Sequence, residues 1–265
     1  MRKTFLLAAC TAAALALAGC GGSTAGTAAP APGAAAPAPV AQITTIDQLS
    51  DAISKSTQGK TSASMSMNMS VGGQSITGEG AYAINGSDVK MQLTLTVPQM
   101  GAMEMRLIDR VMYVKNSQPN AKWLKMPVDP NDPRTAQFSQ IIDQVDVTKQ
   151  FDQFKSISTM KGKAEEPVDG APATRYDIAV DMSKAAAAAT TPAEKEQIEQ
   201  LQQSGVQNVD MQLWLDQANL PIQYKTAISA QGQAVTVLVK LKNWGEPVTV
   251  TAPPADQITE LPKGN

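Results

Sequence analysis

A strict alternation of apolar and polar residues constrains the fold of this chain more than any other feature. Met65, Met67, Met69 and Val71 alternate with serine and asparagine over residues 64–71. Successive side chains of a strand point to opposite faces of the sheet. The alternation therefore predicts a strand with one buried face and one solvated face.

The same signal recurs along the chain and predicts an antiparallel meander of about eleven strands. The other expected strands lie near residues 76–84, 91–97, 103–107, 111–114, 122–124, 157–164, 174–182, 209–215, 222–228 and 235–241. Gly72-Gly73 and Asn85-Gly86 separate the first three strands. Such dipeptides favour the tight turns of β-hairpins.

Three segments predict helices instead. Residues 46–53 have apolar side chains at helical spacing, with Thr45 as a possible N-cap. A proline-rich loop over 127–133 precedes a second helix, which presents one apolar stripe. This stripe consists of Phe138, Ile141, Ile142 and Val145. Residues 184–203 form a third, mostly polar helical insert that we expect on the surface, with a capping box at Thr191 and Glu194.

The sheet consequently has one apolar face that something must cover. About eleven strands make a wider face than two or three helices can cover, which favours a cavity between them. The apolar face is unusually rich in methionine, with the inward positions Met65, Met67, Met69, Met91, Met103, Met105, Met182 and Met211. Two interpretations remain open at this point: an adaptable surface for apolar ligands, or gap-filling in a closed core.

Several motifs resemble the LppX/LprG family of actinobacterial cell-envelope lipoproteins. They are Met112-Tyr113-Val114-Lys115 with Trp123-Leu124-Lys125, Leu213-Trp214-Leu215-Asp216 with Leu220-Pro221-Ile222, and Asn243-Trp244-Gly245-Glu246-Pro247-Val248 with Ala252-Pro253. The resemblance implies an α+β fold like that of the carrier LolA. In that fold, a curved antiparallel half-barrel is crossed by helices over its concave apolar face. The alanine-rich insert at 184–191 departs from the family pattern.

The resemblance also implies a function and a site. We expect the chain to bind acyl chains of envelope lipids or glycolipids and to carry or present them without catalysis. The head group would lie near the loop at 127–133. The expected lining residues are Met65, Met67, Met69, Met91, Leu93, Leu95, Met103, Met105, Phe138, Ile141 and Ile142. An envelope transporter is a candidate partner. The alternative is an envelope protein-interaction or stress-sensor module with a closed core.

The amino end predicts export. Arg2 and Lys3 precede an apolar stretch, which ends at a small-residue cleavage site before Cys20. This layout is typical of a signal peptide over residues 1–19. Leu17-Ala18-Gly19-Cys20 resembles the bacterial lipobox. The resemblance implies lipidation of Cys20 and anchorage on the outer face of the cell membrane. Residues 20–43 then form an Ala/Pro/Gly-rich tether, and residues 44–265 form a single lipid-binding domain.

Composition excludes several kinds of site. The chain has no histidine, and its two cysteines are Cys10 and Cys20. A histidine-based triad and a histidine metal site are therefore impossible, and we expect no metal or cofactor. Of the 22 basic residues, Arg2 and Lys3 leave with the signal, so 20 remain against 24 acidic ones, a net charge of −4. This balance argues against nucleic acid as a partner.

Three weak motifs admit a catalytic or metal-binding interpretation. Ser158 and Lys161 fit the S-x-x-K spacing of a serine nucleophile and its base, but residues three apart in a strand face opposite ways. The adjacent residues Glu165 and Glu166 also face apart if they lie in a strand. The segment 129–132 begins like a calcium loop, without the required glycine and glutamate. We therefore expect no enzyme activity.

Overall fold

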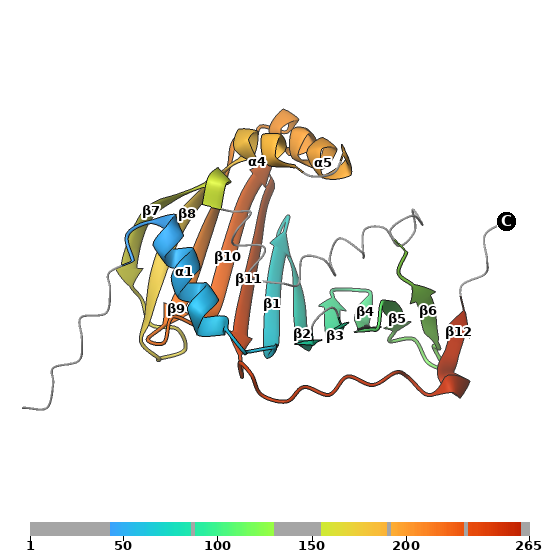
Figure 1. Ribbon diagram of the computed structural model, residues 1–265. Helices are drawn as coiled ribbons and strands as arrows, with labels where there is room; N and C mark the ends of the chain where they lie inside the picture. The colour runs from blue at the N-terminus through green and yellow to red at the C-terminus, as the bar shows by residue number, and fades with distance from the viewer. Residues whose placement is uncertain (1–42, 86–87, 130–154, 190–191, 231–232, 261–265) are drawn as a thin grey trace, which may run out of the picture. The chain divides into compact units, whose positions relative to one another are not determined.

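The computed structural model describes residues 43–85, 88–129, 155–189, 192–230 and 233–260 (Figure 1). Within this part of the chain, one curved sheet of 12 strands has the order β12-β6-β5-β4-β3-β2-β1-β11-β10-β9-β8-β7. The sheet is unclosed, because β12 and β7 are its two outer strands. The paired strands are antiparallel, except that β12 runs parallel to β6. The structure thus confirms the expected α+β half-barrel.

All eleven expected strands are present. Their bounds are β1 Ser62–Val71, β2 Gln74–Asn85, β3 Asp88–Val97, β4 Gly101–Ile108, β5 Val111–Asn116, β6 Trp123–Pro127, β7 Ser158–Glu165, β8 Ala173–Asp181, β9 Asn208–Asp216, β10 Pro221–Ala230 and β11 Gln233–Lys242. The twelfth, β12 at Ile258–Glu260, was not expected. Three residues are too few to produce a recognisable alternation.

The two glycine-bearing turns connect strands as expected. Gly72 and Gly73 have φ values of 55° and 83°, and Val71 pairs with Gln74 across them. Glycine adopts this left-handed backbone without steric cost, and the resulting turn matches the twist of the strands. β2 and β3 also form a hairpin, with Asn85 opposite Asp88 and the two residues between them outside the described part.

Helix α1 (Ile46–Thr57) covers the part of the apolar face formed mainly by β8 and β9. Thr45 and Gln48 form a capping box, in which the Thr45 hydroxyl accepts from the Gln48 backbone N–H at 3.2 Å. The buried side chains Leu49 and Ile53 pack against strands β8 and β9. Their cluster contains Ile43, Tyr176, Ile178, Leu213 and Leu215, with Met160, Met211 and Tyr224 at its margin. In Figure 1, α1 lies along this part of the sheet.

The expected helical insert is present, with one difference at its start. It consists of two helices, α4 (Met182–Ala188) and α5 (Pro192–Gln203). Met182 begins α4 and is buried, so its expected place on strand β8 was wrong. Strand β8 ends at Asp181 because the Asp181 carboxylate accepts the backbone N–H groups of Ser183 and Lys184 and so caps the helix. Thr191, part of the expected capping box, lies outside the described residues.

After β11 the chain runs along the lower ends of the strands to β12 (Figure 1). Gly245 donates its N–H to the Ser62 carbonyl at 2.8 Å, and the Ser62 hydroxyl donates to the Glu246 carbonyl at 2.6 Å. Farther along, Arg106 donates to the Thr251 carbonyl at 2.9 Å. These bonds attach the C-terminal segment to β1 and β4, so that β12 reaches β6.

Candidate functional site

The strand register gathers the expected sheet residues on one face. Met67 of β1 lies between Val239 of β11 and Gly78 of β2. Leu93 of β3 lies between Gly80 and Met105. By the same register, the face formed by β1, β3 and β4 carries Met65, Met67, Met69, Met91, Leu93, Leu95, Met103 and Met105. We call this set the methionine–leucine face. It continues the face that α1 covers over β8 to β10.

Burial varies over the apolar side of the sheet, and away from α1 the side chains of Tyr82, Leu107 and Met112 are also buried. Under α1, Leu213 and Leu215 are 2% and 1% exposed. By contrast, all eight side chains of the methionine–leucine face are partly exposed. Among the described residues, the neighbouring apolar clusters contain strand residues with Trp244 and Val128, and no helix residue. The methionine–leucine face is therefore apolar and partly exposed.

Two glycines of β2 lie beneath the side chains of this face. A Cβ atom on Gly78 would lie 2.9 Å from Cδ2 of Leu95 and 3.3 Å from Cε of Met67. A Cβ atom on Gly80 would lie 2.3 Å from the Gln92 carbonyl oxygen. The leucine and methionine side chains consequently lie over bare backbone, which is the role of glycine where chains approach closely or a sheet bends.

The structure does not describe the remaining expected site residues. Phe138, Ile141 and Ile142, the expected helix over 138–145 and most of the loop at 127–133 lie outside the described residues. Cys20, the expected signal and the expected tether also lie outside them, apart from Ile43. Their assigned roles stay predictions, as does the lining role of the eight sheet residues.

Sequence reasoning overlooked Tyr82, which lies on the same apolar face. It is opposite Ala63 and Met91, is 5% exposed, and belongs to a cluster with Val239 and Leu241. Its hydroxyl has no hydrogen-bond partner among the described residues. Tyr82 follows Gly78 and Gly80 at a spacing of two, so the alternation already pointed to it. The residue was missed because tyrosine is common in ordinary strands.

The surroundings of Tyr82 explain its unpaired hydroxyl. The Trp244 ring meets the Tyr82 ring edge-on, with centroids 6.4 Å apart. Trp244 cannot serve as donor to Tyr82, because its indole N–H already donates to the Pro221 carbonyl at 2.8 Å. Burial, reinforced by the nearby Tyr224, raises the pKa of Tyr82 far above its usual value. Burial likewise raises the pKa of Tyr224. Tyr82 is therefore a neutral hydroxyl at physiological pH.

The raised tyrosine pKa values predict alkaline destabilisation. Below the unfolded pKa of about 10, neither state ionises these phenols and stability is unaffected. Above it, the unfolded chain loses the protons while the fold retains them, so the free energy of unfolding falls as pH rises. The limiting slope is about 1.4 kcal/mol per pH unit for each such tyrosine. Urea unfolding between pH 9 and 11 should show this fall, and Tyr82→Phe should make it shallower. If the free energy of unfolding of Tyr82→Phe fell with pH as steeply as that of the native chain, the raised pKa of Tyr82 would be contradicted.

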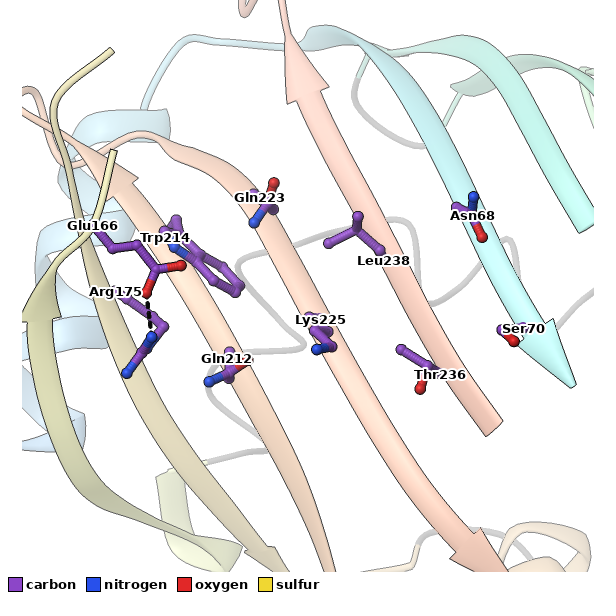
Figure 2. Close-up of a pocket in the computed structure, with 10 residues that line it drawn as sticks. All are labelled: Asn68, Ser70, Glu166, Arg175, Gln212, Trp214, Gln223, Lys225, Thr236 and Leu238. Atoms are coloured by element: carbon purple, nitrogen blue, oxygen red, sulfur yellow. Dashed lines mark hydrogen bonds and ion pairs between the residues drawn. The ribbon is translucent and has the colours of Figure 1, made fainter. Parts of the chain in front are cut away.

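The opposite, polar face carries a shallow hollow of about 550 Å³ (Figure 2). It is lined by Asn68, Ser70, Glu166, Arg175, Gln212, Trp214, Gln223, Lys225, Thr236 and Leu238. A second hollow of about 450 Å³ shares Asn68 and Leu238 with it. Trp214 is 3% exposed and packs against Val168, Ala173 and Ile222. The hollow is thus part of the solvated face that the alternation predicts.

Charged groups beside the hollow pair with one another. Arg175 forms ion pairs with Glu166 and with Asp177, whose Oδ1 is 3.0 Å from Nε. The hydrogen bond to Asp177 is the main reason that the pKa of Arg175 is raised. Glu165 instead accepts from the Thr174 hydroxyl at 3.1 Å. The two adjacent glutamates therefore have different partners, which does not favour a carboxylate pair for acid–base chemistry.

The other reactive motifs gain no support from the geometry. Ser158 is buried in β7, whereas Lys161 is exposed at a bulge between Met160 and Gly162. The described residues contain no cluster of three or more potential metal ligands. The suspected calcium loop lies outside the described residues except for Asp129. In the part of the chain that the structure covers, no helix has the length and apolarity needed to span a membrane.

Comparisons with known proteins show similarity of structure rather than of sequence. No family model matches the chain, and no curated protein matches it. Among solved structures, lipoprotein LppX of Mycobacterium tuberculosis is similar, with a TM-score of 0.51 and 13% identity over 78% of this chain and 98% of that one. LprF from Mycobacterium bovis aligns with a TM-score of 0.49 and 16% identity, over 78% of this chain and 96% of LprF.

The Pseudomonas aeruginosa MucA/MucB complex aligns with a TM-score of 0.35 and 13% identity, over 80% of this chain and 59% of the other.

The likeness to LppX extends over nearly the whole of the LppX chain. At such low identity it shows a shared fold. The chain therefore has the fold of the lipoprotein LppX: a curved, unclosed, mostly antiparallel sheet with helices.

Proposed function

We propose that this chain is a lipoprotein anchored through Cys20 to the outer face of the cell membrane, and that its methionine–leucine face binds acyl chains of envelope lipids or glycolipids. The protein carries or presents these lipids without making or breaking a bond. One observation carries the proposal. Eight apolar side chains share one sheet face and all are partly exposed, whereas Leu213 and Leu215 beneath α1 are buried. A closed core would bury the eight side chains as well.

The physical basis of such carriage is partition. Exposure of an acyl chain to water is unfavourable by about 0.8 kcal/mol for each methylene. An apolar face shields the chain during transfer and so lowers the barrier between two membranes. Methionine side chains suit this task because they are flexible and polarizable and adapt to ligands of different shape. The shared fold of LppX, itself described as a lipoprotein, supports the proposal.

A fluorescent hydrocarbon tests the apolar face directly. The chain from Gly21 onward, exported without the lipid anchor, should bind diphenylhexatriene with strongly increased fluorescence. Met67→Glu should weaken this binding at least tenfold, because the carboxylate would be desolvated when the hydrocarbon covers it. The cost to folding should stay below about 1.5 kcal/mol, since Met67 is partly exposed.

Asn68→Glu is the matched control. Asn68 is the next residue of β1 and is exposed on the opposite face. The Asn68→Glu substitution adds the same charge at nearly the same place in the strand. Because this charge lies on the opposite face, binding of the hydrocarbon should be unchanged. Equal losses in both variants, or no binding by the native chain, would refute the proposal. If Met67→Glu instead unfolds the protein, the closed-core interaction module becomes the better account.

A further inference from the structure

Tyr82 places a buried hydroxyl on the apolar side of the sheet. Its side chain is 95% buried, since 5% remains exposed, and its hydroxyl has no partner among the described residues. Leaving a buried hydroxyl unpaired is unfavourable, and buried polar groups in folded proteins are nearly always hydrogen-bonded. The neighbouring Trp244 N–H donates to a backbone carbonyl, whereas Tyr82 has no such partner in the described part of the chain. The hydroxyl is thus available to a ligand atom.

Tyr82 also stands next to the face proposed to hold acyl chains. The side chains packed against its cluster include Met65, Met67 and Met91, three of the eight members of that face. On β1, the residue opposite Tyr82 is Ala63, whose side chain is a single methyl group. The methionines are flexible, so they can move aside without a change in the backbone. A ligand lying on the face can therefore bring an oxygen atom within reach of the Tyr82 hydroxyl.

The chemistry of the hydroxyl defines the ligand atom. Burial keeps the phenol protonated, so it donates a hydrogen bond. An acceptor in an apolar environment must itself be uncharged, because an ion would be costly to desolvate. The carbonyl oxygen of an acyl ester meets both conditions. A pure hydrocarbon offers no acceptor at all.

We propose that the Tyr82 hydroxyl donates a hydrogen bond to an ester carbonyl oxygen of the bound lipid, so that the face selects esterified acyl chains over bare hydrocarbon. This inference rests on the proposed function and names the chemical class of its ligand. Tyr82 then fixes where along the strands an acyl chain begins, while the methionine–leucine face accepts chains of varied shape.

A pair of ligands equal in size tests the selection. Methyl palmitate and nonadecane have the same number of non-hydrogen atoms and differ in the ester group. Each would compete with diphenylhexatriene for the chain from Gly21 onward, and the ratio of the two Kd values measures the preference. Nonadecane is the more hydrophobic ligand, so the hydrogen bond is measured by the change in this ratio between the native chain and a variant. Tyr82→Phe, which removes a single oxygen atom, should shift the ratio about tenfold away from the ester, the value of one neutral hydrogen bond.

Tyr113→Phe is the matched control. Tyr113 is also buried, but it lies on the opposite face, in register with Arg106 and Lys125. Its loss of one hydroxyl should leave the preference for the ester intact. As a direct readout, the infrared carbonyl band of bound ¹³C-labelled methyl palmitate should shift to higher frequency in Tyr82→Phe and not in Tyr113→Phe.

Each outcome decides one of the two proposals. If the native chain fails to bind diphenylhexatriene, the proposed function fails. If it binds this hydrocarbon but Tyr82→Phe leaves the ratio of the two Kd values unchanged, only the present inference is overturned. Tyr82→Phe should be at least as stable as the native chain, because it removes an unpaired buried hydroxyl. A clear loss of stability would reveal a partner within the fold and would also overturn the inference.

Discussion

Replacing Gly80 by alanine is expected to lower the free energy of unfolding by about 3 kcal/mol, because the added methyl group collides with backbone. The new Cβ would lie 2.3 Å from the Gln92 carbonyl oxygen and 3.1 Å from the Cα of Leu93. Neither atom can move without displacing strand β3 from β2, and both strands lie inside the sheet. Urea unfolding followed by circular dichroism measures the effect.

Two other glycines serve as controls for Gly80→Ala. At Gly78, the nearest atom is the Cδ2 of Leu95, the end of a flexible side chain, so Gly78→Ala should lose only about 1 kcal/mol. At Gly162, the nearest atom is Asp177 Oδ2 at 3.7 Å, an ordinary contact. Gly162→Ala should therefore be neutral or slightly stabilising, since alanine restricts the unfolded chain. Equal effects at all three positions would show that steric contact is not the cause.

Truncation of Leu49 to alanine is expected to lower the free energy of unfolding by roughly 3 kcal/mol, within the range for fully buried leucines. Leu49 has no exposed surface and packs with Ile53 against Leu213 and Leu215. The lost methyl and methylene groups leave a cavity that the helix and the strands cannot fill, because both are fixed by other contacts. The midpoint and slope of urea unfolding give the loss directly.

Lys55→Ala is the control on the same helix. Lys55 is exposed in the last turn of α1, where its charge interacts with the helix dipole. Its removal should cost a few tenths of a kcal/mol at most. A loss below about 1 kcal/mol for Leu49→Ala would mean that α1 is not packed on the sheet in solution. The burial of Leu213 and Leu215 would then need another explanation.

The shared face of several candidate site residues could be predicted from the local alternation, and the structure places these residues together. The alternation through Met65, Met67 and Met69 correctly put them on one face of β1, because side-chain direction within a strand depends only on the position along it. Met182 shows the limit of this reasoning. It continues the pattern of β8, yet a local hydrogen bond from Ser183 to Asp181 starts a helix there. A side-chain cap outweighs periodicity at the end of an element.

Features that depend on distant partners were beyond the reach of the sequence. The alternation does not say which strand lies beside which, so the pairing of β1 with β11 and of β12 with β6 appears only in the fold. Tyr82 could be placed on the apolar face by its spacing, but its unpaired hydroxyl depends on Trp244 donating to Pro221 instead. Such a bond joins residues far apart in the chain.

By itself, then, the sequence determined a one-sided sheet, its hairpins and its first helix, since each depends on propensities and contacts between neighbours in the chain. Only the tertiary structure decided that α1 buries Leu213 and Leu215 and that the methionine–leucine face stays partly exposed. The physical reason is that burial depends on what packs above a side chain. Residues identical in pattern, such as Leu213 and Leu93, therefore differ in exposure.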